Sequence, residues 1–110
     1  MANTFTRKLS RGVGTTATAI GSYTVAANTT VVIVGLTVTN TSGSAITANV
    51  FINDGSANTS VVTNAPISSG ASLIPVGGDQ KIVLLTGDSV RVQSSAASSI
   101  DAILSIMEIT

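Results

Sequence analysis

The sequence predicts an all-β fold: one antiparallel β-sandwich of the jelly-roll or immunoglobulin-like kind, with about eight strands and an extended N-terminal arm. Three observations lead to this prediction. Val, Ile and Thr are abundant, and β-branched side chains suit a pleated sheet better than a helix. Short apolar or alternating segments recur at intervals of about 8 to 12 residues, between Gly, Asn and Asp turns. No stretch of useful length shows the helical period of about 3.6 residues.

The length and composition indicate a single domain that associates with other subunits. The chain has 110 residues, the usual length of one domain. Apolar residues make up 44%, but only Phe5, Tyr23 and Phe51 are aromatic, so Val, Ile, Leu and Ala must fill the core. Charged residues make up 9% and the formal net charge is zero. Because low net charge promotes association, we expect other subunits to cover much of the surface; the alternative is an ordinary monomer hydrated by Ser, Thr and Asn.

The residue types exclude several kinds of chemistry. The chain has no Cys and no His, which excludes disulfides, thiolate nucleophiles, imidazole bases and the usual zinc sites. We therefore expect neither an enzyme nor a bound cofactor. The basic N-terminus lacks an apolar signal region, and no segment approaches the ~20 apolar residues of a membrane span. These features predict an unexported protein outside membranes.

Residues 1–11 are expected to form a basic arm or an edge strand, and residues 12–110 the sandwich. Arg7, Lys8 and Arg11 are three of the five Lys and Arg residues in the chain. Alternation along the segment fits an extended strand anchored by Phe5 and Leu9. A basic arm can contact nucleic acid or an acidic protein surface. Without interleaved aromatic residues the nucleic-acid interpretation is the weaker one, and Lys and Arg are common on solvated edge strands.

Turn residues and alternation locate the other strands. They are expected at residues 15–25, 30–40, 46–52, 59–64, 71–76, 81–85, 89–93 and 99–110. The segment 30–40 is interpreted as a central strand, and Gly35 in its middle indicates a bulge or a close backbone approach. Residues 41–44 and the Gly87-Asp88 corner are expected to be hairpin turns.

Three further positions carry information about packing. The last strand is apolar on both faces toward its end and includes Ile103 and Met107, so it lies in the middle of a sheet or under a partner. Phe51 points away from the alternating apolar residues of its strand, and we favour a partner contact over a second core layer. Pro66 lacks an N–H, so it ends its strand or marks a sheet edge.

The sequence offers candidates for two kinds of binding site. Asp54, Asp79 and Asp88 each lie next to a Gly in a turn, and converging carboxylates can bind Ca²⁺. Their spacing is not that of a calcium loop, and Asp stabilises turns without a metal, so we favour turns and expect no metal. Carbohydrate-binding modules share this fold class but usually present Trp or Tyr to the sugar, whereas this chain has no Trp and one Tyr.

Several segments together resemble a known group of proteins. They are Ala65-Pro66-Ile67, Ser69-Gly70-Ala71-Ser72-Leu73, Gln80–Leu84, Thr86–Val92 and Ile103–Thr110. Residues 23–30 and 34–40 are similar in style. These patterns resemble small virion proteins of tailed bacteriophages, cyanophages among them, over nearly the whole chain. They are strand and turn patterns, and what they imply is a β-sandwich structural component of the particle.

Low charge, hydroxyl-rich strands, a basic arm and a two-faced last strand suit a subunit that repeats on a symmetric shell or tail. We expect a capsid decoration or cement protein that forms homo-oligomers and contacts the major capsid protein or other virion proteins, in a particle assembled in the host cytoplasm. The alternatives are a neck, tail or fibre component and, from a different class, a carbohydrate-binding adhesin module that uses residues 53–58. The expected partner-contact residues are Phe5, Arg7, Lys8, Leu9, Arg11, Phe51, Ile103 and Met107.

Overall fold

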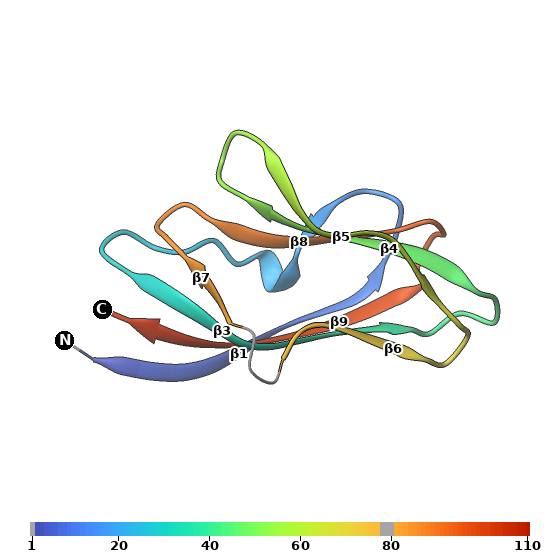
Figure 1. The fold of residues 1–110 in the computed structure, drawn as a ribbon, viewed down its shortest axis with the longest axis horizontal. Coiled ribbons are helices and arrows are strands. Elements are labelled where there is room, and N and C mark those ends of the chain that lie inside the picture. The colour runs from blue at the N-terminus through green and yellow to red at the C-terminus, as the bar shows by residue number, and fades with distance from the viewer. Residues whose placement is uncertain (1, 78–80) are drawn as a thin grey trace.

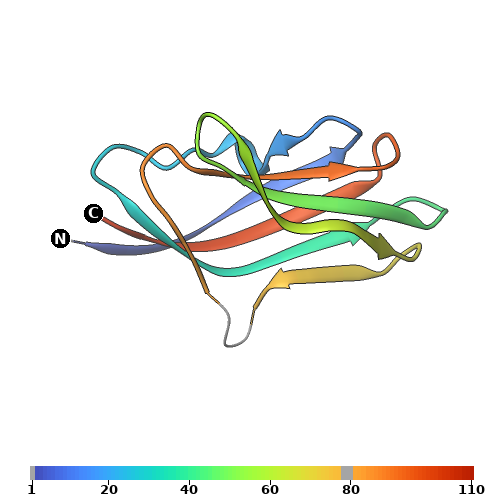
Figure 2. The same ribbon diagram turned by 45° about the horizontal axis from the view of Figure 1, so that its top comes forward.

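The structure, a computed structural model, describes residues 2–77 and 81–110; Gly78, Asp79 and Gln80, which belong to segments named above, lie outside it. Two antiparallel sheets pack face to face as a sandwich (Figures 1 and 2), which confirms the predicted fold class. The larger sheet contains β1 (Asn3–Val13), β3 (Thr30–Asn40), β6 (Ser72–Val76), β7 (Ile82–Leu84) and β9 (Ile100–Ile109). The smaller contains β2 (Thr18–Ala19), β4 (Ile46–Asn53), β5 (Asn58–Ile67) and β8 (Ser89–Ser94). A short 3-10 helix, η1 (Ile20–Ser22), follows β2.

The strand order is that of a jelly roll. The larger sheet runs β1-β9-β3-β6, with β7 also paired to β3, and the smaller runs β2-β8-β4-β5. The antiparallel pairs are therefore nested: β1 with β9, β2 with β8, β3 with β6 and β7, and β4 with β5. Such a chain is one long hairpin wound into two sheets. The first and last strands consequently lie side by side, as Figure 1 shows.

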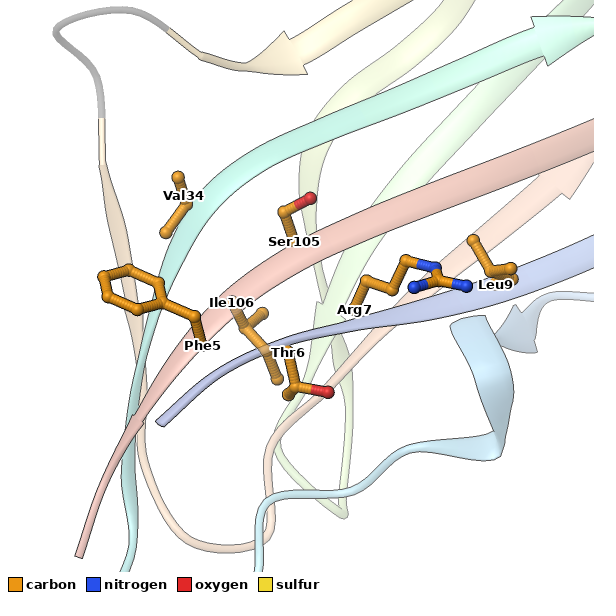
Figure 3. A pocket seen from close by; sticks show the side chains of 7 residues that line it. All are labelled: Phe5, Thr6, Arg7, Leu9, Val34, Ser105 and Ile106. Carbon is orange, nitrogen blue, oxygen red and sulfur yellow. The ribbon is translucent and has the colours of Figure 1, made fainter. Parts of the chain in front are cut away.

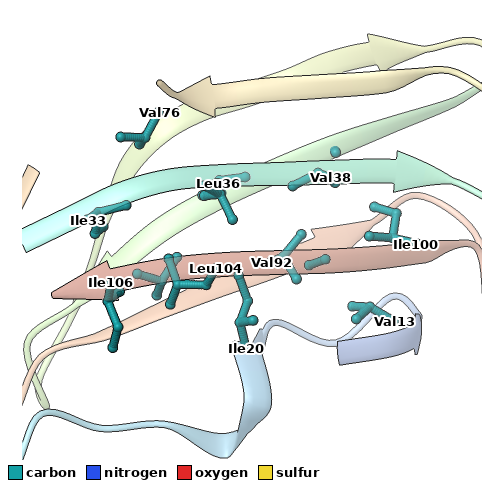
Figure 4. Close-up of a cluster of buried hydrophobic side chains, with 14 of the residues drawn as sticks. Val13, Ile20, Ile33, Leu36, Val38, Val76, Val92, Ile100, Leu104 and Ile106 are labelled. Carbon is teal, nitrogen blue, oxygen red and sulfur yellow. The ribbon is translucent and has the colours of Figure 1, made fainter. Parts of the chain in front are cut away.

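The core between the sheets is aliphatic (Figure 4). Among the described residues its buried apolar side chains are Val13, Ile20, Val25, Val31, Ile33, Leu36, Val38, Ile46, Ala48, Val50, Ile67, Val76, Leu84, Val90, Val92, Ile100, Ala102, Leu104 and Ile106. The core is thus built from Val, Ile, Leu and Ala, as predicted. Complete burial of one Val, Leu or Ile side chain stabilises a fold by about 1.5 to 3 kcal/mol.

Two predicted strands are central in the structure. β3 has the predicted bounds, Thr30–Asn40, and a bulge in its pairing with β9 falls between Ile33 and Gly35. β9 lies between β1 and β3, so it occupies the middle of the larger sheet. The N-terminal segment is strand β1, which pairs with β9 in continuous register from Asn3 to Ser10.

The prediction of one strand over residues 15–25 is wrong. Only the two residues of β2 pair with β8, and η1 follows them. Gly21 (φ +62°) and Ser22 (φ +54°) adopt the left-handed conformation, which ends an extended chain and is easiest for Gly. Gly21 packs so closely on β1 that an added Cβ would lie 2.8 Å from the Lys8 Cβ. Its N–H donates to Ser10 Oγ over 2.8 Å.

Two predicted hairpin turns connect the sheets instead. Residues 41–44 lead from β3 to β4, and the Gly87-Asp88 corner leads from β7 to β8; in both cases the two strands belong to different sheets. The sequence marks a turn at these places but does not determine which strands pair. Pro66 lies within β5, at an edge of the smaller sheet, where no further strand needs its missing N–H.

Asn40 stabilises the crossover from β3 to β4. The residue is fully buried, and its Nδ2 donates to the carbonyl oxygens of Ser44 (2.8 Å) and Ile67 (3.0 Å). Its Oδ1 accepts hydrogen bonds from the N–H (2.9 Å) and the Oγ–H (2.7 Å) of Ser42. Both donors and both acceptor sites of the amide are therefore used. One side chain thus ties the end of β3 to the crossover loop and to β5 of the other sheet.

In the described part of the chain, no helix has the length and apolar character needed to span a membrane.

Candidate functional site

The outer face of the larger sheet carries an apolar row that crosses its strands. Paired residues of neighbouring strands point to the same face of a sheet. Phe5 pairs with Met107, Met107 with Val32, and Val32 with Val83. The row therefore extends over β1, β9, β3 and β7. The flanking residues along these strands point to the inner side of the sheet, where Val31, Ile33, Leu84 and Ile106 are buried.

A second apolar row lies further along the same face. Leu9 pairs with Ile103, and Ile103 pairs with Thr37, while exposed Ile74 on β6 extends the surface at the opposite edge. Exposure is large: 74% for Phe5, 66% for Ile74 and 46% for Ile103. We call the following set the apolar face: Phe5, Leu9, Val32, Val34, Ile74, Val83, Ile103 and Met107. Of the large apolar side chains exposed in the described residues, all belong to this set except Leu85, which directly follows β7.

A groove of about 640 Å³ separates the two rows. Arg7 pairs with Ser105, and Ser105 pairs with Gly35. Because Ser105 is small and Gly35 has no side chain, the sheet surface is low beside Arg7. Figure 3 shows Phe5 on one side of Ser105 and Leu9 on the other. The lining residues are Phe5, Thr6, Arg7, Leu9, Val34, Ser105 and Ile106. A partner therefore meets two apolar ridges with a groove between them.

Charge on this side of the molecule is concentrated at the β1 margin. Arg7 makes no hydrogen bond or ion pair with any described residue. Asp101 accepts the Gly12 N–H at its Oδ1 over 3.0 Å. Arg11 is exposed and lines a smaller hollow of about 160 Å³ together with Asp101 and Ile103. The face is thus apolar in its middle and carries guanidinium groups along one edge.

Lys8 does not belong to this surface. It alternates with Arg7 along β1 and so points to the inner side, where its Nζ lies 4.8 Å from the centre of the Tyr23 ring. The Tyr23 hydroxyl donates to Glu108 Oε2 over 2.6 Å. Partial burial, then this hydrogen bond and the negative charge of Glu108, raise the pKa of Tyr23 far above its ordinary value. The three residues fasten the segment after η1 to β1 and β9.

Phe51 also lies elsewhere. It is half-buried on the outer face of the smaller sheet, between Arg91 of β8 and Ser60 of β5. The structure therefore brings five of the predicted contact residues onto one face, places Arg11 at its margin, and separates Lys8 and Phe51 from it. The five are Phe5, Arg7, Leu9, Ile103 and Met107.

Four members of the apolar face were not predicted from the sequence: Val32, Val34, Ile74 and Val83. The sequence did carry a signal for Val83: residues 82–85 are apolar at every position, so some of their side chains must lie on the outer face of the sheet. Val34 could not be assigned from alternation, since the bulge beside Gly35 shifts the pattern.

Asp54 and Asp88 act as turn caps. Asp54 Oδ1 accepts the N–H groups of Ser56 (2.9 Å) and Ala57 (3.0 Å), and these bonds lower the pKa of Asp54. Asp88 Oδ2 accepts the Leu85 N–H over 2.9 Å. Within residues 2–77 and 81–110 no three acidic, His or Cys side chains come together as a metal site. Asp79, which was weighed with them, lies outside the described residues.

Comparisons with known proteins define the fold and go no further. No protein-family model and no curated protein sequence matches the chain. Among solved structures, a subunit from the work titled "Bacillus endospore appendages form a novel family of disulfide-linked pili" matches with a TM-score of 0.52 and 16% identity, over 100% of this chain and 91% of that one. A chain of the virus-like particle of the extra small virus of the giant freshwater prawn Macrobrachium rosenbergii matches with a TM-score of 0.52 and 12% identity, over 97% of this chain and 77% of that one.

A pentameric capsid protein from metagenomic phage sequences matches with a TM-score of 0.44 and 18% identity, over 94% of this chain and 58% of that one. At that score the likeness carries no argument. The two better matches are only 16% and 12% identical to this chain, so they show a similar fold and nothing more.

Proposed function

We propose that this protein is a structural subunit of a virion, and that it attaches to its neighbours through the apolar face. The observation that carries the proposal is the gathering of almost all large exposed apolar side chains on one side of one sheet. Monomeric proteins rarely expose a contiguous apolar patch larger than a few hundred Å² unless it binds something. The apolar face spans all the strands of the larger sheet, so it is more than a set of separate exposed side chains.

The chemistry of the face suits a large protein partner. It is broad and open, with two apolar ridges and a groove whose polar lining residues are Thr6, Arg7 and Ser105, whereas a small-molecule site is a concave pocket that buries most of its ligand. Charge occurs at the margin and not in the middle, which is the usual arrangement of a protein interface with an apolar centre and a polar rim. The low charge content of the whole chain supports extensive coverage in an assembly.

The virion is the assembly that we favour. The sequence resembles small virion proteins of tailed bacteriophages, and the two better fold matches come from a pilus and from a virus-like particle. Within the virion we propose a decoration or cement protein that lies on the major capsid protein and stabilises the shell by many small contacts. A neck, tail or fibre position is the alternative within the particle.

A carbohydrate-binding adhesin is the weaker alternative from another class. The polar groups of residues 53–58 bond to one another: Asn53 Nδ2 donates to Asn58 Oδ1 over 2.8 Å, and Asn53 Oδ1 accepts the Gly55 N–H over 2.8 Å. Asp54 caps the same turn. No aromatic ring lies among residues 53–58 to stack on a sugar. These features leave the loop little to offer a glycan.

The number of copies in purified particles tests the proposed position. Quantitative mass spectrometry against the major capsid protein should give a count proportional to the number of capsomers if the protein decorates the shell. A count equal to that of a neck or baseplate ring would replace decoration by the tail alternative. Absence from washed particles would overturn the virion role altogether, and binding to a glycan array would then favour the adhesin.

A further inference from the structure

We propose that two copies of this chain pair through the free edges of their β1 strands, in one register that joins the two larger sheets into a single sheet. The other edges are poorly suited to pairing. β2 has two residues, β5 contains Pro66 and is bulged against β4, and β6 contains Pro75 and shares its edge of β3 with β7. β1 keeps one register from Asn3 to Ser10 without a bulge or a proline. Such an edge is a template for another strand.

The hydrogen bonds at the chain ends show which backbone groups of β1 are free. Ala2 and Thr110 exchange both backbone hydrogen bonds, over 3.3 and 3.0 Å. In an antiparallel pair such residues alternate with residues whose N–H and C=O point away from the partner strand. The residues of β1 that point away from β9 therefore have odd numbers, starting with Asn3, Phe5 and Arg7. Their side chains all lie on the outer face of the sheet.

Helix η1 limits this free edge at its far end. A Cβ on Gly21 would lie 3.3 Å from the Leu9 nitrogen, so η1 occupies the space beside that backbone N–H. The open ladder thus comprises Asn3, Phe5 and Arg7, and it is symmetric about Phe5.

This symmetry selects one register. If Phe5 pairs with the partner's Phe5, then Asn3 pairs with the partner's Arg7, and Arg7 with the partner's Asn3. All free groups are then used in about six hydrogen bonds. Any shift along the strand that keeps the outer faces on one side leaves at least one of the three residues without a partner. A shift that pairs Arg7 with the partner's Arg7 also places like charges opposite each other.

The side chains agree with this register. Phe5 has the largest exposed fraction among the exposed apolar side chains, 74%, and it would lie beside the partner's Phe5 at the two-fold axis, as aromatic cross-strand pairs do. The two Arg7 side chains would stand about 14 Å apart along the strands, beyond the screening length of about 8 Å at physiological salt. Opposing charge therefore does not obstruct the pairing.

A pairing limited to these residues is small, so the dimer is expected to be weak in dilute solution. It matters most when both copies lie on one support, because the two-fold axis is perpendicular to the sheet and puts both apolar faces on the same side. Two linked faces then bind more tightly than either does alone. The pairing itself does not depend on the virion role, since the isolated chain is sufficient to test it.

Disulfide trapping tests both the pairing and its register, because the chain has no cysteine of its own. In the proposed dimer the Cα atoms at position 5 are about 5.5 Å apart, within disulfide range. Purified Phe5→Cys should therefore form a disulfide dimer at least about tenfold faster than Val83→Cys, because pairing raises the local thiol concentration. Val83 is an exposed control on the same face, on β7 and away from β1. Arg7→Cys alone should react no faster than the control.

A second pair of variants keeps Phe5 in place. A mixture of Asn3→Cys and Arg7→Cys should crosslink as a heterodimer, whereas neither alone should exceed the Val83→Cys rate; circular dichroism checks that each variant is folded. If neither Phe5→Cys nor the mixture reacts faster than the control, the pairing is wrong. If Arg7→Cys crosslinks to itself while the mixture does not, the register is wrong.

Discussion

Removal of the Asn40 side chain is expected to destabilise the fold more than any other single polar truncation that we consider. In Asn40→Ala, the carbonyl oxygen of Ile67 loses its donor in a buried place, and the carbonyl of Ser44 loses another. The N–H of Ser42 loses its acceptor, and its hydroxyl loses one of two acceptors, since the Ser44 carbonyl oxygen lies 2.9 Å from it. The end of β3 is then no longer tied to the crossover loop and to the smaller sheet.

The size of the effect follows from these four hydrogen bonds. Each net hydrogen bond contributes about 0.5 to 1.5 kcal/mol, and a buried group left without a partner costs about 1 to 3 kcal/mol. Ser42 is only partly buried and Ser44 is exposed, so water replaces some of what they lose. We therefore expect a loss of about 3 kcal/mol, which lowers the melting temperature of a domain of this size by about 15 °C. Asn40→Asp should be at least as harmful, because it places a carboxylate oxygen against two carbonyl oxygens.

Urea unfolding followed by circular dichroism measures this free energy. The matched control is Asn58→Ala, whose amide oxygen accepts an exposed hydrogen bond from Asn53; it should change the free energy of unfolding by less than about 0.5 kcal/mol. A loss below about 1 kcal/mol in Asn40→Ala, with an unchanged urea dependence, would refute the assignment of Asn40 as the main tie of this crossover.

Three further predictions test the fold around the apolar face. Leu104→Ala should cost about 3 kcal/mol in urea unfolding, while Ile103→Ala, its neighbour on β9 that faces solvent, should cost less than about 0.5 kcal/mol; equal effects would contradict the inward and outward assignment. Gly21→Ala should cost more than about 1 kcal/mol, and Gly43→Ala, with no atom within 4 Å of an added Cβ, much less. The raised pKa of Tyr23 means that the folded state keeps its proton where the unfolded state loses it, so stability should fall as the pH rises above about 10; Tyr23→Phe should abolish that part of the decline, and parallel profiles for both proteins would contradict it.

Much of the fold follows from local sequence. The segment from Thr30 to Asn40 fixes a strand by its apolar run and alternation, and its bulge follows from Gly35. The pairing of strands does not follow, because a turn such as residues 41–44 has the same composition whether it closes a hairpin or crosses between sheets. Residues 15–25 do not form the expected extended strand, because Gly21 is left-handed where it packs on β1. This contact joins distant segments of the chain, so no local sequence pattern indicates it.

Residues of the candidate site could be predicted where the alternation of apolar and polar residues shows which side of a strand each side chain lies on. Phe5, Leu9 and Ile103 were found because β1 and β9 alternate regularly and pair in register. Phe51 was grouped with them because it also points away from its neighbours' core side, but its strand belongs to the other sheet. Alternation gives the side of a strand on which a residue lies, whereas the topology decides which strands share that side.

Binding of a variant in the apolar face shows whether that face is the attachment surface. Ile103→Asp places a charge in the middle of the apolar face without touching the core, and Ser60→Asp places the same charge on the outer face of the smaller sheet, beside Phe51. Each folded variant is mixed with particles that lack the protein, and the bound fraction is measured by co-sedimentation. The proposed function predicts that Ser60→Asp binds like the wild type while Ile103→Asp loses at least about 90% of its binding, as a buried unpaired charge requires. Equal binding of the two variants would contradict the assignment of the apolar face as the attachment surface.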